Sequence, residues 1–147
     1  DVCVPISRLA EAVVGANEKA AELGLVAPVV GHAGDGNFHA SLLLDMDNAE
    51  EVANAETYVS WLNERAIALG GTCTGEHGIG QGKRPYLVKE LGGAVDVMVG
   101  VKRALDPLGS PPRHTGSKEI RDSPHVARGR FSALSGRGSA LEFWWCG

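Results

Sequence analysis

A short glycine-rich segment with a histidine on each side limits the possible folds of this chain more than any other feature. Residues 31–39 read GHAGDGNFH, so the tetrapeptide GDGN lies between His32 and His39. Glycine, Asn and Asp readily adopt turn conformations, and GDGN therefore predicts a tight reversal of the chain. Apolar residues common in strands lie before and after it, at 29–30 and 42–44. The pattern predicts two adjoining extended segments that hold the two imidazoles close together across the turn.

A second polar motif supplies a carboxylate and another imidazole. Residues 74–80 read TGEHGIG, with Glu76 next to His77. With His32 and His39, Glu76 makes a set of two histidines and one carboxylate, which leaves coordination positions open as catalytic metal sites do. Zinc, manganese or iron suits these ligands, whereas magnesium and calcium prefer more oxygen atoms. The sequence therefore predicts that His32, His39 and Glu76 bind one divalent ion, zinc or manganese.

Other polar residues of the two motifs have alternative roles. A single histidine in a turn more often bonds to backbone, so the metal interpretation depends on the combination of residues. Asn37 either holds the turn or reaches a substrate with its amide, and Asp35 is expected to form an Asx turn. His77 either ligates the metal or acts as a general base, because imidazole titrates near neutrality. Lys83 follows a glycine-rich run without phosphate-loop spacing and is expected to be solvated.

Apolar periodicity predicts helices around these motifs. Apolar residues recur every three or four positions, which indicates amphipathic helices, over residues 9–23, 48–69 and 94–105. Asn48 and Glu51 have the spacing of a capping box, and Ser7 is expected to cap the first helix. Pro85 favours the first turn of a further short helix.

Extended segments alternate with these helices. They are expected near residues 2–5, 25–30, 42–44 and 72–74. This order predicts an α+β fold, with an antiparallel or mixed sheet and helices packed on one face, as in a ferredoxin-like cap domain. Cys73 lies close to the second motif, and we expect a buried thiol there rather than a ligand.

Charge and composition divide the chain at about residue 108. Residues 1–108 carry 15 acidic and 8 basic side chains, whereas residues 109–147 carry 3 and 6. An acidic body argues against a nucleic-acid surface. No apolar run approaches the roughly 20 residues of a membrane span. Residues 109–147 are rich in Gly, Ser, Pro and Arg without a sustained period, which predicts a disordered tail.

Four segments together resemble a known family. They are DVCVP at residues 1–5, the first motif, GEHGIG at 75–80 and KRALDP at 102–107. The combination resembles the C-terminal domain of FAD-linked oxidases of the vanillyl-alcohol-oxidase type. Within that family it is most similar to D-lactate and D-2-hydroxyacid dehydrogenases and glycolate oxidase subunits. The resemblance covers residues 1–108 and predicts that residues 109–147 lie outside the family domain.

The resemblance implies a reaction and a role for each site residue. By analogy with the family, His32, His39 and Glu76 bind a divalent metal and His77 is the catalytic base. The implied reaction oxidises a small 2-hydroxy acid, such as D-lactate, to a 2-oxo acid, with hydride transfer to FAD. The family binds FAD mainly through a domain that precedes this region. A mitochondrial location is also implied.

The start of the chain suggests a fragment. It begins with Asp1 in an extended segment rather than with Met, so we expect a preceding flavin domain and any targeting segment to be missing. Such a fragment is expected to be inactive alone. Two further functions stay open: a non-catalytic truncated isoform that acts as a binding partner, and a metal-dependent hydrolase that uses the same ligands with water as nucleophile.

Overall fold

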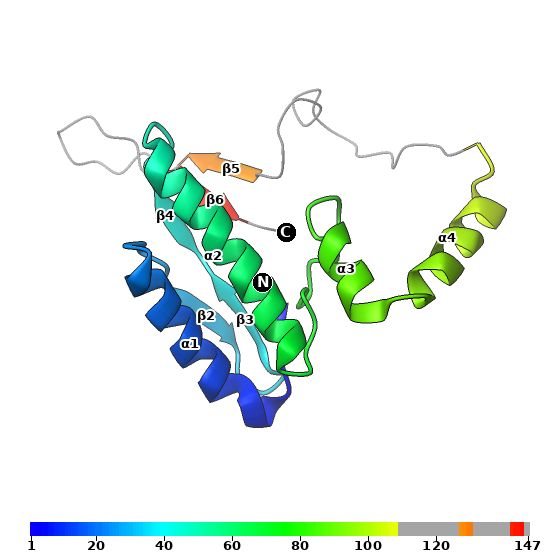
Figure 1. Cartoon of the computed structure of the whole chain (residues 1–147), viewed down its shortest axis with the longest axis horizontal. Helices are drawn as coiled ribbons and strands as arrows, with labels where there is room; N and C mark the ends of the chain where they lie inside the picture. Colours follow the sequence, from blue (N-terminus) through cyan, green and yellow to red (C-terminus); the bar gives the residue numbers. More distant parts are fainter. Residues whose placement is uncertain (109–126, 131–141, 146–147) are drawn as a thin grey trace.

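An antiparallel sheet with two helices on one face forms the body of the domain (Figure 1). The computed structural model describes residues 1–108, 127–130 and 142–145. The sheet contains, in spatial order, β1 (Val2–Cys3), β3 (Asn37–Ala40) and β2 (Val29–His32). Both neighbouring pairs are antiparallel. Helices α1 (Leu9–Glu22) and α2 (Ala49–Ala68) cover it, so the predicted α+β class is confirmed.

The order of the elements is that of a split β-α-β unit. After β1, α1, the β2–β3 hairpin and α2, the chain returns to the free edge of β1. There Thr72 pairs with Cys3 in an isolated antiparallel bridge. This bridge occupies the place of the fourth strand in a ferredoxin-like β-α-β-β-α-β arrangement. The return brings the second polar motif next to the start of the chain.

A second small sheet involves the region beyond residue 108. Strand β4 (Leu42–Leu44) pairs with β6 (Glu142–Trp145), which in turn pairs with β5 (Ala127–Arg130). These two strands differ from the predicted disordered tail, and the rest of that prediction lies outside the described residues. The aromatic run of β6 favours extended structure, and the edge of β4 offers it backbone hydrogen-bonding groups.

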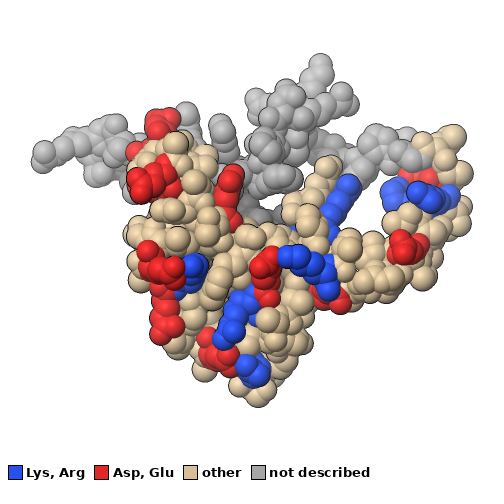
Figure 2. All heavy atoms as spheres, viewed as in Figure 1, with Lys and Arg blue, Asp and Glu red and all other residues tan. Residues whose placement is uncertain are grey.

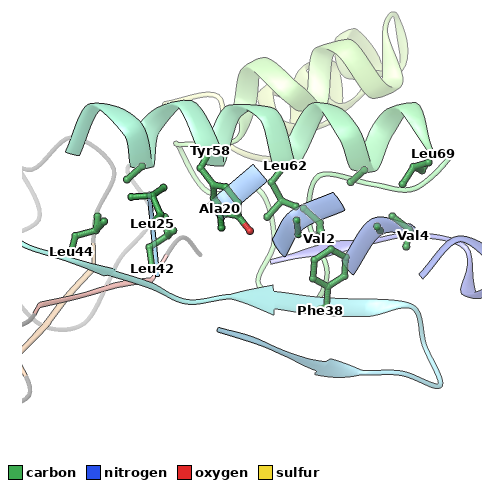
Figure 3. Close-up of a cluster of buried hydrophobic side chains, with 14 residues drawn as sticks. Val2, Val4, Ala20, Leu25, Phe38, Leu42, Leu44, Tyr58, Leu62 and Leu69 are labelled. Carbon is green, nitrogen blue, oxygen red and sulfur yellow. The ribbon is translucent and has the colours of Figure 1, made fainter. Parts of the chain in front are cut away.

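The pleat of β3 separates the core from the opposite face. Phe38 pairs with Val2, and both side chains are buried beneath the helices with Tyr58 and Leu62 (Figure 3). Because neighbouring residues of a strand point to opposite faces, His39 points away from the helices. The hydrophobic core and the first histidine motif thus occupy opposite faces of one strand.

The helix starts illustrate how local signals succeed and fail. Asn48 caps α2, since its Oδ1 accepts hydrogen bonds from the amides of Glu50 and Glu51 at 3.1 and 3.4 Å. The predicted cap at Ser7 is wrong. Pro5, with its φ of −51°, starts a 3₁₀ turn (Ile6–Arg8), and α1 follows directly from that turn. Because proline restricts φ, the 3₁₀ turn begins directly after Pro5. Ser7 then lies inside that turn and not at the start of a helix.

Replacing the cap should weaken α2 measurably. Asn48→Ala leaves two helix amides without their side-chain acceptor, and we expect a loss of about 0.5–2 kcal/mol in the free energy of unfolding. Asn48→Asp keeps the acceptor and serves as the control. Chemical denaturation followed by circular dichroism measures both. Equal stability of the Ala and Asp variants would contradict the capping role.

Two further helices extend from the body. Helices α3 (Arg84–Leu91) and α4 (Ala94–Leu105) follow the second motif, and α4 projects away from the sheet beyond α3 (Figure 1). Its apolar Val97, Val101 and Leu105 are 68%, 54% and 81% exposed. Among the described helices, none has both the length and the apolar character needed to cross a bilayer.

Acidic and basic side chains intermingle on the face that Figure 2 shows. Glu11 of α1 and Arg65 of α2 approach to 2.6 Å, and Glu64 of α2 pairs with Lys89 of α3. A surface pair such as Glu11–Arg65 contributes about 0–1 kcal/mol. These pairs align neighbouring helices, while the buried apolar residues supply most of the stability.

Cys73 is a buried thiol, as predicted, with no solvent exposure. Burial and the nearby Glu90 carboxylate raise its pKa to about 11.

Since the thiolate is the reactive form, iodoacetamide at pH 8 should modify Cys73 far more slowly in the native chain than in denaturant. The native rate should rise as the pH approaches 11. Peptide mass spectrometry reads out the modification, with the half-buried Cys3 as internal comparison; equal native and denatured rates at pH 8 would contradict the burial.

Candidate metal and substrate site

Three imidazoles converge on one carboxylate oxygen. The Nε2 atoms of His32, His39 and His77 lie 3.6, 3.4 and 3.7 Å from Glu76 Oε1. The rings of His32 and His39 meet edge to face with centroids 5.9 Å apart, and those of His39 and His77 are 5.2 Å apart. The structure therefore brings together the histidines and the carboxylate that the sequence singled out.

The β2–β3 hairpin places the first two histidines. Its register pairs His32 with Asn37 and Val30 with His39. Residues two apart on a strand share a face, so His32 and His39 are diagonal neighbours on the face opposite the core. The predicted approach of the two imidazoles across the turn is thus a consequence of strand register.

Hydrogen bonds to the backbone fix the turn. The amide of Asp35 donates to the carbonyl of His32 at 2.9 Å, and the amide of Val4 donates to the carbonyl of Gly36 at 2.9 Å. Gly36 has φ +75°, and a Cβ there would collide with the Val4 carbonyl oxygen. Glycine is needed at this position both for its backbone angle and for the close contact.

Asp1 positions the loop that carries Glu76. Its Oδ2 accepts hydrogen bonds from the amides of Gly75 at 2.9 Å and His77 at 3.4 Å. A Cβ at Gly75 would collide with Asn37 Oδ1 and Asp1 Oδ1, so only glycine allows this approach. The loop therefore reaches the hairpin because a small residue lies where two polar side chains meet.

Sequence reasoning missed Asp1. Its side chain is 2% exposed, with Oδ1 3.5 Å from His39 Nδ1 and Oδ2 3.2 Å from His77 Nδ1. The pairing of Val2 with Phe38, continued by one residue, places Asp1 opposite His39. This register is the signal that could have revealed Asp1, but the sequence alone does not show which strands pair.

Lys83 is buried, contrary to the expectation that it is solvated. It is 2% exposed, and its Nζ donates to the backbone carbonyl of Asp1 at 2.5 Å. Its stem lies beside Tyr58 and Asn63 around a cavity of about 20 Å³. The long apolar stem packs in the core while the charged end finds a carbonyl acceptor.

Two overlapping groups have metal-ligand spacing among the described residues. One contains His32, His39 and Glu76, and the other contains Asp1, His39 and His77; within each group the ligand atoms lie within 4.8 Å of one another. Burial lowers the pKa of His39, which favours the neutral imidazole that metals bind. Two imidazoles and a carboxylate suit zinc or manganese.

His32 and Glu76 of the first group border an open pocket of about 340 Å³. A pocket of this size suits a small molecule. Asn37 also lines the pocket; it is 6% exposed, and its buried Oδ1 has no hydrogen-bond partner among the described residues. The lining residues are Cys3, His32, Asp35, Asn37, Gly75 and Glu76.

Comparison with known proteins assigns the family. The family described as FAD linked oxidases, C-terminal domain, matches residues 1–110. This chain belongs to that family. The match includes both polar motifs and all four α-helices of the domain.

The relatives of this FAD-linked oxidase domain are much longer. The chain is 47% identical over 108 residues to a probable mitochondrial D-lactate dehydrogenase of Danio rerio, covering 73% of this chain and 22% of the relative. It is 50% identical over 108 residues to a mitochondrial D-lactate dehydrogenase (cytochrome) of Kluyveromyces lactis, covering 73% and 18%. A glycolate oxidase subunit of Bacillus subtilis is 42% identical over 108 residues, covering 73% and 23%. The chain thus spans about a fifth of these relatives.

A methyl group at Gly75 should disrupt the site. In Gly75→Ala the new Cβ overlaps two polar side chains, and overpacking of this kind costs about 1–3 kcal/mol. We expect a lower melting temperature and shifted imidazole resonances of His39 and His77. Gly34→Ala is the matched control, because a Cβ at Gly34 meets nothing within 4 Å. Histidine resonances unchanged in Gly75→Ala would contradict the close approach of the loop.

Proposed function

We propose that this chain is the substrate- and metal-binding part of a flavin-dependent D-2-hydroxyacid dehydrogenase, with D-lactate as the representative substrate. The observation that carries the proposal is the convergence of His32, His39 and His77 on Glu76 Oε1, beside a pocket that His32 and Glu76 line. The names of the relatives at 47% and 50% identity support the substrate class.

His32, His39 and Glu76 are the proposed ligands of one divalent ion, zinc or manganese. His32 and Glu76 border the pocket, and their side chains are 58% and 53% exposed, whereas that of His39 is 14% exposed. The alternative group of Asp1, His39 and His77 is more buried, and the Asp1 side chain is only 2% exposed. When bound, the ion supplies a Lewis acid beside the hydroxyl and carboxylate of a 2-hydroxy acid.

His77 is the proposed general base. Its Nε2 lies 3.7 Å from Glu76 Oε1, beside the ligand set, and its Nδ1 faces Asp1. This orientation presents Nε2 to take the proton of the substrate hydroxyl. Asn37 is a further proposed substrate contact, through the amide that borders the pocket.

FAD supplies the hydride acceptor of this chemistry. In the proposal it is bound mainly by the part of the protein that the relatives possess beyond the matched 108 residues, and this chain alone is inactive. A mitochondrial location is proposed from the names of the eukaryotic relatives. The related glycolate oxidase subunit of Bacillus subtilis means that this chemistry extends to bacteria as well.

A chimeric enzyme tests the proposal. Residues 1–108 replace the matching segment of the Danio rerio relative, and stopped-flow absorbance follows flavin reduction by D-lactate and L-lactate. We expect reduction by D-lactate and metal bound in about equimolar amount. Glu76→Ala should lose the metal, whereas His77→Ala should keep it and slow flavin reduction by about 10²–10⁴-fold, the usual contribution of a general base.

The outcomes separate the functional alternatives. A chimera that binds metal but leaves the flavin oxidised, when the unaltered relative is reduced, indicates a non-catalytic binding remnant. Loss of metal in His77→Ala would make His77 a ligand and reverse its assigned role. Equal rates with both lactate enantiomers would contradict the proposed substrate class.

A further inference from the structure

One buried carboxylate faces the inner nitrogens of two site histidines. Asp1 Oδ1 lies 3.5 Å from His39 Nδ1, and Asp1 Oδ2 lies 3.2 Å from His77 Nδ1. The two oxygens thus lie beside different imidazoles, while the Nε2 atoms of both imidazoles face Glu76. We propose that Asp1 is the positioning residue of the site, which fixes the orientation and the tautomer of His39 and His77 together.

Hydrogen-bonding chemistry supports this assignment. An ionised carboxylate only accepts hydrogen bonds, so a neutral imidazole that bonds to it must carry its proton on Nδ1. Its Nε2 then carries the lone pair, on the side of the ring that faces Glu76. For His39 that lone pair is available to a metal, and for His77 it is available to a proton.

The surroundings hold Asp1 itself in place. Its carboxylate also accepts hydrogen bonds from the amide of Gly75 and the hydroxyl of Thr74, at 2.9 and 3.5 Å. Its backbone carbonyl accepts a hydrogen bond from the buried Lys83. The side chain is 2% exposed, so water does not compete for its oxygens. A carboxylate fixed in this way can set the geometry of two rings, one in strand β3 and one in the loop that carries Glu76.

The expected effect of Asp1 on metal binding and on the base rests on the proposed function. Carboxylates that accept a hydrogen bond from a metal-ligating histidine orient the ring and raise its basicity, and their removal typically lowers metal affinity about 10–100-fold. Here the same carboxylate would orient a ligand and a base. The competing arrangement, with Asp1, His39 and His77 as ligands, requires metal on Nδ1 and the proton on Nε2.

Histidine NMR distinguishes the two arrangements. The chain, released from a fusion so that it starts at Asp1, is labelled with ¹⁵N-histidine. Long-range ¹H–¹⁵N spectra are recorded without metal and with zinc. We expect His39 and His77 as Nδ1–H tautomers in both states, with zinc shifting Nε2 of His39. An Nε2–H tautomer of either residue in the wild type overturns the proposal.

Zinc titration of a variant that lacks the Asp1 charge provides the second measurement. Asp1→Asn should lower zinc affinity about 10–100-fold and mix the tautomers of His39 and His77. Asp35→Asn is the matched control, because it removes a carboxylate from the rim of the same pocket. It should leave zinc affinity within about twofold, since interactions of surface charges contribute little. Wild-type affinity and tautomers in Asp1→Asn overturn the proposal.

The two measurements also separate this inference from the proposed function. If wild-type chain with Nδ1–H tautomers binds no zinc, the metal assignment fails and the role of Asp1 in orienting the rings stands. Circular dichroism reports whether Asp1→Asn folds. If it does not fold, the wild-type tautomers still decide the proposal.

Discussion

The antiparallel pairing of β1 with β3 is the interaction on which the rest of this domain depends. It buries Val2 against Phe38 under the helices and, on the opposite face, aligns Asp1 with His39. Because strand side chains alternate strictly, one register creates both the core and the site. A shift of one residue would place Asp1 in the core and break both.

The second motif depends on the same strand. The bridge between Cys3 and Thr72 returns the chain to the edge of β1, and Asp1 then binds the amides of the loop that follows. Glu76 and His77 reach the hairpin by this route. The backbone of the loop is held from a buried side, while Glu76 remains half-exposed at the pocket. Hydrogen bonds to a buried carboxylate thus lie beneath side chains that are accessible at the pocket.

The family match identifies the domain, whereas the structure shows how its residues are arranged. The family match covers the whole domain up to α4, whereas the matched segment is only 22% and 18% of the two mitochondrial relatives. The domain accordingly contains only part of such a protein, and the reaction and substrate assigned to it are proposals that rest on its cluster of polar residues. The exposed apolar residues of α4 lie on a helix that packs mainly against α3 in the described part of the chain.

The sequence by itself determined the elements and the identity of most site residues. The spacing of apolar residues gave α2 and α4, the pair Asn48 and Glu51 gave the start of α2, and GDGN between two histidines gave the hairpin. These signals are local, since a few neighbouring residues contain them. Tertiary structure alone decided the burial and contacts of Asp1 and Lys83, and it placed two strands in a region expected to be disordered. An acidic residue before a strand and a lysine before a helix look solvated in sequence. Only the pairing of β1 with β3 and the return of the chain after α2 bury them, because burial is a property of contacts between segments far apart in the chain.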